Sequence, residues 1–144
     1  LTPSPLVVSS RQVRDALLDE KSLQDVSTMT EYADMSVVGI GAAVEGATVL
    51  RNGILNEGEL TVLKMQGAVG DVLNHFMDKD GTLIKTEIED RVISTDLDKL
   101  RQLKNVVGVA GGKDKVTAIK AVLNGGYLNV LITDSDTAAE LLLS

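Results

Sequence analysis

The sequence predicts an α/β domain in three layers, with a mostly parallel sheet and a small β-hairpin insertion. Two apolar runs, MSVVGIGAA over residues 35–43 and VVGVA over residues 106–110, lack polar alternation, which is typical of parallel strands buried on both faces. About the last fifty residues alternate helical and extended patterns, as right-handed βαβ crossovers do. An Asp80-Gly81 turn signal between strand-forming residues predicts the hairpin.

Residues 1–32 predict a short extended piece followed by two helices. The extended piece ends at Val8, and Ser9 or Ser10 is expected to cap the first helix. Ser22 is expected to cap the second helix. Both helices precede the first apolar strand.

The middle of the chain predicts a long functional loop over residues 45–67 that carries a short helix from Glu57 to Met65. After the hairpin, Ser94 or Thr95 is expected to cap a helix that runs to Leu103.

The C-terminal part predicts a helix, a strand and a final helix. The helix in KDKVTAIKAVLNGG is expected to end at Gly125, because glycine commonly closes helices. A strand then covers residues 127–133, and Asp134 or Ser135 caps the last helix.

Composition bounds the kind of protein. At 144 residues and 44% apolar side chains the chain can form one domain with its own core. Its net charge is −7, with 21 acidic against 14 basic residues, which argues against direct binding of nucleic acid by this segment. No cysteine and a single histidine exclude disulfides and cysteine zinc sites, and we expect no metal and no cofactor.

The compartment is inferred from what the sequence lacks. No run reaches the roughly 18 apolar residues of a membrane span, and LTPSPLVVSS has no signal-peptide order. We therefore expect a cytoplasmic protein with no membrane partner. Because the sequence begins at Leu1 and not at methionine, we expect residues 1–144 to be one domain truncated from a longer protein.

Two glycine-rich turns follow the predicted strands, where ligands of parallel sheets bind. Glycine lets backbone N–H groups approach an anion, and a helix N-terminus adds partial positive charge. Lys113 or Lys115 would add a full charge. The alternative is that these glycines only make tight connections, and no dinucleotide fingerprint is present because Val44 stands where its third glycine belongs. The candidate residues are Gly39, Gly41 and Ala42 at the first turn and Gly111 and Gly112 at the second.

Three further side chains are candidates for chemistry. Asp71 could accept hydrogen bonds from sugar hydroxyls or cap a helix. Arg51 could clamp a phosphate bidentately or simply keep a surface solvated. A Ser–His–acid triad has only His75 to draw on, and packing or exposure to solvent is the more common role for such a histidine.

A family resemblance rests on several motifs in order, from about Pro5 to the C-terminus. They are VVGIGA, GAVGD followed by FMDKDG, RVIS, and the long stretch VVGVAGGKDKVTAIKAVLNGGYLNVLITDSDTAAELL. Together these motifs resemble the effector-binding domain of the SorC/DeoR-type sugar-responsive bacterial transcriptional regulators. The long C-terminal stretch is the most specific of them.

The resemblance implies a fold similar to glucosamine-6-phosphate deaminase and ribose-5-phosphate isomerase. It also implies a phosphorylated sugar as effector, a homo-oligomer (dimer or tetramer), and operator DNA bound only through a helix-turn-helix region outside this chain. In that family a lysine at the position of Lys115 contacts phosphate or sugar, an acid at Asp71 contacts sugar hydroxyls, and an arginine near Arg51 contacts phosphate in some members.

The chain departs from the family in two respects. The family's first phosphate-binding loop lies outside this sequence, and Leu73-Asn74-His75 replaces a small-residue and arginine run that many members carry. The leading interpretation is a sugar-phosphate effector-binding and oligomerisation domain, with no catalytic residue. The alternatives are a phosphosugar isomerase or deaminase that uses Asp71 with Lys115, and a chain that retains only the oligomerisation surface.

Overall fold

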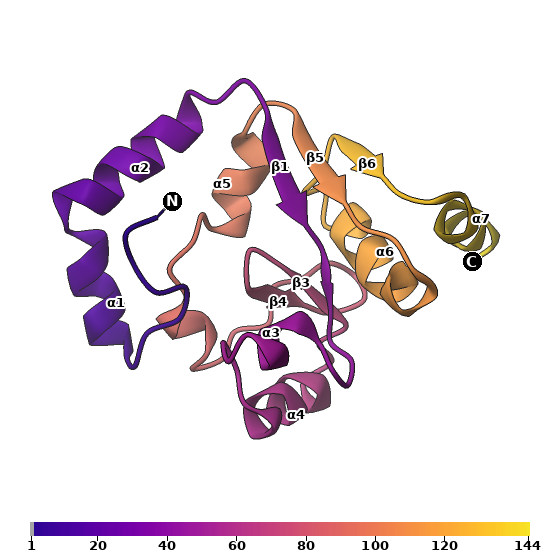
Figure 1. Ribbon diagram of the computed structural model, residues 1–144, viewed down its shortest axis with the longest axis horizontal. Helices are drawn as coiled ribbons and strands as arrows, with labels where there is room; N and C mark the ends of the chain where they lie inside the picture. Colours follow the sequence, from indigo (N-terminus) through magenta and orange to yellow (C-terminus); the bar gives the residue numbers. More distant parts are fainter. Residues whose placement is uncertain (1) are drawn as a thin grey trace.

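The computed structural model describes residues 2–144 and contains a three-stranded parallel sheet (Figure 1). Its strands are β1 (Ser36–Gly39), β5 (Val106–Val109) and β6 (Val130–Ile132), in the spatial order β1-β5-β6. Residues of the two apolar runs therefore pair side by side, with Val37 opposite Val107 and Val107 opposite Val130. The predicted α/β architecture with a parallel sheet is confirmed.

The first apolar run was expected to form one strand. In the structure it is divided between two sheets. β1 ends at Gly39, and β2 (Gly41–Ala42) belongs to a second, antiparallel sheet. Ile40 lies at the junction with its side chain 2% exposed. The Lys115 ammonium donates to the Ile40 carbonyl over 2.8 Å, so a side chain satisfies the backbone where the chain changes sheets.

The antiparallel sheet contains a hairpin that the sequence did not indicate, just before the predicted turn. β3 (Gly70–Val72) pairs with β2 and with β4 (His75–Met77), in the order β2-β3-β4. Leu73 and Asn74 form the β3–β4 turn with φ of 55° and 65°, the left-handed pair that tight hairpins require. The predicted Asp80-Gly81 turn follows β4 and reverses the chain, because the Asp78 N–H donates to the Thr82 carbonyl and the Ile84 N–H to the Phe76 carbonyl. The returning Leu83 forms an antiparallel bridge with Met77.

Two helices lie at one end of the molecule, next to the N-terminal segment (Figure 1). α1 (Arg11–Leu18) begins after Ser10, whose hydroxyl oxygen accepts from the Val13 N–H. Ser10 is thus the cap, one of the two serines that were predicted for this role. α2 (Lys21–Glu31) begins after Glu20, so the cap predicted at Ser22 is wrong, and the helix starts two residues earlier than expected. A small cluster anchors this end to the rest of the chain through Val8, Leu23 and Ile93.

Two helices lie in the predicted loop over residues 45–67. α3 (Thr48–Arg51) is a single turn that the sequence did not indicate. α4 (Glu57–Met65) has the predicted bounds, because Asn56 caps it and Glu59 completes a reciprocal capping box. A 3₁₀ turn, η1 (Glu89–Arg91), follows further on.

The remaining helices flank the parallel strands. α5 (Leu97–Gln102) is capped by Asp96, so the caps predicted at Ser94 or Thr95 are wrong by one or two residues. Ser94 and Thr95 are instead used in a hydrogen-bond network described below. 

In the last two helices, the end of the first and the cap of the second match the predictions. α6 (Val116–Asn124) follows a 3₁₀ turn, η2 (Lys113–Lys115), and ends at Gly125. α7 (Ser135–Leu143) is capped by Asp134, whose carboxylate accepts from the Thr137 N–H. No helix of the described residues 2–144 is long and apolar enough to cross a membrane.

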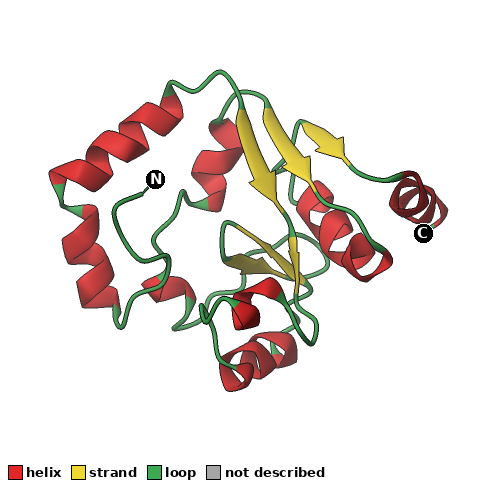
Figure 2. Ribbon diagram, in the orientation of Figure 1, coloured by secondary structure: helices red, strands yellow, loops and turns green. Residues whose placement is uncertain are grey.

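The main core lies between one face of the parallel sheet, α5, α6 and the hairpin (Figures 1 and 2). Successive strand residues point to opposite faces, so Val38 and Val106 face this core while Val37 and Val109 face away. The second face is apolar and open to solvent: Val37 is 65% exposed and Ile132 55% exposed. The main cluster comprises Val38, Ile40, Ala42, Val72, Met77, Leu97, Leu100, Val106, Ala110, Ala118, Ile119, Ala121, Val122 and Tyr127.

Candidate functional site

A pocket of about 540 Å³ lies where β1 passes into β2. The loop before α3, the end of β1, the β3–β4 hairpin and η2 enclose it. Six of the eight predicted site residues line this pocket, namely Gly39, Gly41, Ala42, Arg51, Asp71 and Lys115. The two glycines at positions 111 and 112 do not line it.

Gly41 and Asp71 are paired across β2 and β3. A Cβ atom on Gly41 would lie 2.0 Å from Asp71 Oδ1, which is far inside contact distance. Glycine at position 41 therefore makes room for the carboxylate. This is a specific steric reason for a glycine in this strand.

The Asp71 carboxyl group is buried, with the residue 8% exposed. Burial raises its pKa, while the Asn74 N–H at 3.3 Å from Oδ2 and the positive charges of Lys115 and His75 act in the opposite direction without reversing the shift. A buried carboxylate with spare lone pairs is a strong acceptor for the hydroxyl groups of a ligand.

Two cationic side chains reach the pocket from different elements. Lys115, at the end of η2, is partly buried and is held at the Ile40 carbonyl. Arg51, at the end of α3, is exposed, and its guanidinium donates to Thr48 Oγ1 over 3.3 Å. The pocket thus combines the buried Asp71 carboxyl group with a partly buried lysine and an exposed arginine.

The double glycine at positions 111 and 112 packs against the start of α7 instead of opening to the pocket. The Gly112 N–H donates to Thr137 Oγ1 at 2.8 Å and to Asp134 Oδ2 at 3.1 Å. A Cβ on Gly111 would lie 2.2 Å from Asp134 Oδ2. The Gly112 amide is therefore used within the chain, and the tight-connection alternative accounts for both glycines.

Asp134 is the acceptor around which this corner is built. Hydrogen bonds from the Thr137 N–H and hydroxyl, and from the Gly112 N–H, lower its pKa. One carboxylate therefore caps α7 and fixes the β5–η2 connection at the same time.

A larger cavity of about 960 Å³ lies between α4 and residues 83–91. It contains the Glu59–Arg91 ion pair but none of the predicted site residues. Acidic side chains outnumber basic ones around this cavity, and its Arg91 is already paired with Glu59. In the smaller pocket, by contrast, Lys115 and Arg51 form no ion pair with any described residue, and Asp71 is buried beside them. We therefore assign the candidate site to the smaller pocket.

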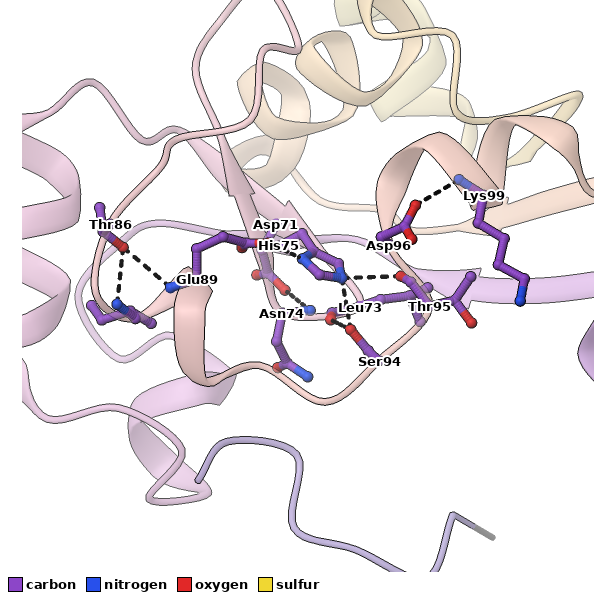
Figure 3. Close-up of polar contacts among 11 residues, drawn as sticks. Asp71, Leu73, Asn74, His75, Thr86, Glu89, Ser94, Thr95, Asp96 and Lys99 are labelled. Carbon is purple, nitrogen blue, oxygen red and sulfur yellow. Dashed lines mark hydrogen bonds and ion pairs between the residues drawn. The ribbon is translucent and has the colours of Figure 1, made fainter. Parts of the chain in front are cut away.

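A serine, a histidine and a glutamate meet behind the hairpin (Figure 3). His75 Nδ1 lies 2.8 Å from Glu89 Oε1, and Nε2 lies 2.7 Å from Ser94 Oγ and 3.0 Å from the Thr95 carbonyl oxygen. The Ser94 hydroxyl donates to the Leu73 carbonyl over 2.8 Å. Because the serine proton points to Leu73 and the carbonyl of Thr95 can only accept, His75 cannot act as base toward Ser94, and this is not a nucleophilic triad.

Sequence reasoning missed several polar residues that reach the pocket. Asn74 is the most informative, because it stands three residues after Asp71 and asparagine favours the left-handed conformation of a hairpin turn. Within residues 2–144 no group of three or more acidic or histidine side chains is arranged to hold a metal ion. The other missed residues that line the pocket are Glu45, Thr48, Asn52 and Asp114.

Fold and pocket together define an α/β ligand-binding domain, and comparison with known proteins identifies its family. The model of the family described as "Putative sugar-binding domain" matches residues 1–143. The chain belongs to this family.

The similar proteins are regulators of transcription. The transcriptional regulator LsrR of Klebsiella pneumoniae is 43% identical over 145 residues, which cover 99% of this chain and 45% of that protein. LsrR of Escherichia coli K12 is 40% identical and is covered to 46% of its length. The chain thus spans about half the length of the regulators that it matches.

Solved structures agree with the fold. A DeoR family transcriptional regulator from Listeria monocytogenes superimposes with a TM-score of 0.92 at 28% identity, over 97% of this chain and 57% of that one. The full-length sorbitol operon regulator SorC from Klebsiella pneumoniae gives a TM-score of 0.84 at 28% identity, over 96% and 44%. These names describe regulators and not enzymes, which confirms the predicted resemblance and counts against the isomerase or deaminase alternative.

Proposed function

We propose that residues 1–144 form one domain that binds a phosphorylated sugar and thereby controls a longer transcriptional regulator. The observation that carries this proposal is the pocket itself, in which buried Asp71 lies with Lys115 and Arg51. Membership of a sugar-binding family and similarity to LsrR and SorC support it.

The chemistry of the pocket fits a ligand with hydroxyl groups at one end and an anion at the other. Asp71 accepts hydrogen bonds from hydroxyl groups, and Lys115 and Arg51 attract a phosphoryl group. The volume of about 540 Å³ lies within the range of small-molecule sites.

Control of transcription requires that the sugar favour one arrangement of the regulator over another. The effector would bind one quaternary arrangement of a homo-oligomer more tightly and shift the population toward it. Operator DNA would be bound by a region outside this chain, in keeping with a net charge of −7 here. Such a regulator works in the cytoplasm.

The test is a comparison of Lys115→Ala with Lys113→Ala by titration calorimetry. Both lysines belong to η2, but only Lys115 lines the pocket. We expect ribose 5-phosphate, glucosamine 6-phosphate or a related sugar phosphate to bind the wild-type chain. Lys115→Ala should weaken that binding by about tenfold or more, as loss of a charge-assisted hydrogen bond does, and Lys113→Ala should not.

Two results would contradict the proposal. Equal affinity of the two variants would remove Lys115 from the site, and equal binding of glucose and glucose 6-phosphate would remove the phosphate requirement. Thermal unfolding of both variants controls for the loss of the Lys115 contact with the Ile40 carbonyl.

A further inference from the structure

Behind the pocket lies a polar network that the proposed function does not use. His75 is 4% exposed and is the only histidine of the chain. It lies on β4 opposite Val72, one residue away from the pocket residue Asp71 in the paired strand. None of His75, Glu89 and Ser94 lines the pocket.

Both ring nitrogens of His75 face hydrogen-bond acceptors. Nδ1 faces the Glu89 carboxylate at 2.8 Å, and Nε2 faces the Thr95 carbonyl at 3.0 Å (Figure 3). A carbonyl oxygen can only accept, so Nε2 carries a hydrogen, and Nδ1 lies within hydrogen-bond distance of the Glu89 carboxyl group. Asp71, on the neighbouring strand, is a second acidic group close to this ring, and a positive charge on His75 acts to lower the Asp71 pKa.

Ser94 connects this buried pair to the turn that shapes the pocket. Its oxygen accepts from His75 Nε2 at 2.7 Å, while its hydroxyl donates to the Leu73 carbonyl at 2.8 Å. Leu73 and Asn74 both have positive φ, a conformation that costs non-glycine residues energy and persists when surrounding contacts hold it. The Asn74 N–H from this same turn donates to Asp71 Oδ2.

We propose that Glu89, His75 and Ser94 form a hydrogen-bonded clasp that positions the Leu73-Asn74 turn and, through it, the Asp71 carboxylate in the pocket. The three are positioning residues that do not touch the ligand. This inference rests on the proposed function only in so far as Asp71 binds a sugar. The clasp joins three separate segments, namely β4, η1 and the loop before α5.

The variant that tests the clasp is Ser94→Ala, with Thr95→Ala as the matched control. Ser94→Ala removes the bridge to Leu73, whereas Thr95 contributes only its backbone carbonyl, which alanine keeps. We expect the dissociation constant for the sugar phosphate that binds best to rise about tenfold in Ser94→Ala, to stay unchanged in Thr95→Ala, and to recover in Ser94→Thr. Equal affinity of Ser94→Ala and Thr95→Ala would overturn the proposal.

A second readout needs no ligand. With one histidine in the chain, ¹⁵N-resolved NMR of the ring is unambiguous, and we expect a hydrogen on Nε2 in the wild type, because this nitrogen faces the Thr95 carbonyl and the Ser94 oxygen. Glu89→Gln changes the partner of Nδ1, so we expect the Nδ1 resonance to shift in that variant. A wild-type ring without a hydrogen on Nε2 would overturn the clasp.

The Asn74 amide resonance separates failure of the clasp from failure of the proposed function. It should shift in Ser94→Ala and not in Thr95→Ala, because the turn moves only in the first. If no sugar phosphate binds the wild type, the proposed function fails, and the ring spectrum and the Asn74 resonance alone decide on the clasp. An unshifted Asn74 resonance in Ser94→Ala would then reject it.

Discussion

Asp71 shows at the scale of one residue how a binding site costs stability. Burial raises its pKa, so the folded chain holds this proton more tightly than the unfolded chain does. The stability associated with the group is full below the ordinary aspartate pKa of 3.8 and is lost as pH rises through the raised pKa of the folded state. Above that raised pKa the ionised carboxylate therefore destabilises the fold, a cost that binding of a hydroxylated ligand would offset.

Asp71→Asn should make the domain more stable and the site inactive. The amide keeps an acceptor for the Asn74 N–H and removes the buried charge, so we expect a gain on the order of 1 kcal/mol at pH 7, of the kind seen when binding residues are neutralised. The gain should vanish below pH 3.8, where aspartate itself is neutral. Thermal unfolding against pH measures it, and exposed Asp114→Asn is the control. A variant less stable than wild type at pH 7 would contradict this account.

Gly41→Ala should displace the Asp71 carboxylate. The new Cβ would meet Asp71 Oδ1 at 2.0 Å, so the acid has to move, at a cost of about 1 to 3 kcal/mol typical of overpacking. Gly39→Ala is the control for stability, because its Cβ would have no neighbour within 4 Å. Urea unfolding compares the two. Equal stability of the variants would show that Asp71 relaxes freely and that Gly41 does not constrain it.

At the scale of elements, α4 was predictable because its signals are local. Asn56 stands at the cap with Glu59 three residues later, and the side chain and backbone of each residue satisfy one another. Glu59 also pairs with Arg91. Burial works to raise the Glu59 pKa, but the hydrogen bond from the Asn56 N–H and the Arg91 charge outweigh it and lower the pKa overall.

Asn56→Ala should cost about 1 kcal/mol, the usual value of a lost N-cap. The Glu59 N–H then loses its acceptor at 2.9 Å. Asn56→Asp keeps an acceptor oxygen and should remain close to wild type. Urea denaturation with an unchanged slope is the measurement. A loss of the same size in both variants would mean that the side-chain NH₂ group of Asn56, and not its oxygen, stabilises the helix start.

Other elements depend on distant contacts and could not be predicted from the sequence. The run over residues 35–43 reads as one strand, but the Lys115 ammonium, 75 positions away from Ile40, satisfies the carbonyl at which it divides. The turn at Asp80-Gly81 was predicted from its strong local signal, whereas the turn at Leu73-Asn74 was missed, and Ser94 bonds the latter from a distant segment. Both missed features lie where a long-range hydrogen bond contacts the backbone.

Part of the candidate site could be predicted from the sequence. Gly39 lines the pocket because it ends a parallel strand, where ligands of such sheets bind. Gly41 and Asp71 meet for a different reason, because they are paired across the antiparallel strands β2 and β3. Gly112 does not line the pocket. Its N–H instead donates to the side chains of Asp134 and Thr137, which follow β6. A glycine pair beside lysines predicts an anion site only when the next strand brings no competing acceptor.

At the scale of the whole molecule, the described residues cover only one of the two faces of the parallel sheet. The positions on the second face are apolar. Those on the outer strands are exposed, with Val37 at 65%, Ile132 at 55% and Val130 at 48%, whereas the central Val107 is 7% exposed. Parallel sheets are normally covered on both faces, and a contiguous apolar patch of this kind promotes association. The homo-oligomer in our proposal is consistent with such a surface.

The 144-residue chain should therefore self-associate through this face, and Val37→Ser with Ile132→Ser should reduce the association. Both side chains are exposed, so the double variant should keep its stability within about 0.5 kcal/mol while the apolar contact between copies is lost. Met29→Ser with Tyr32→Ser, at and just after the end of α2 and 72% and 83% exposed, removes similar apolar area elsewhere. Sedimentation velocity over a range of concentrations compares all three proteins. If the α2 variant dissociates and the sheet variant does not, the copies meet at the other end of the molecule, and the open face of the sheet plays no part in assembly.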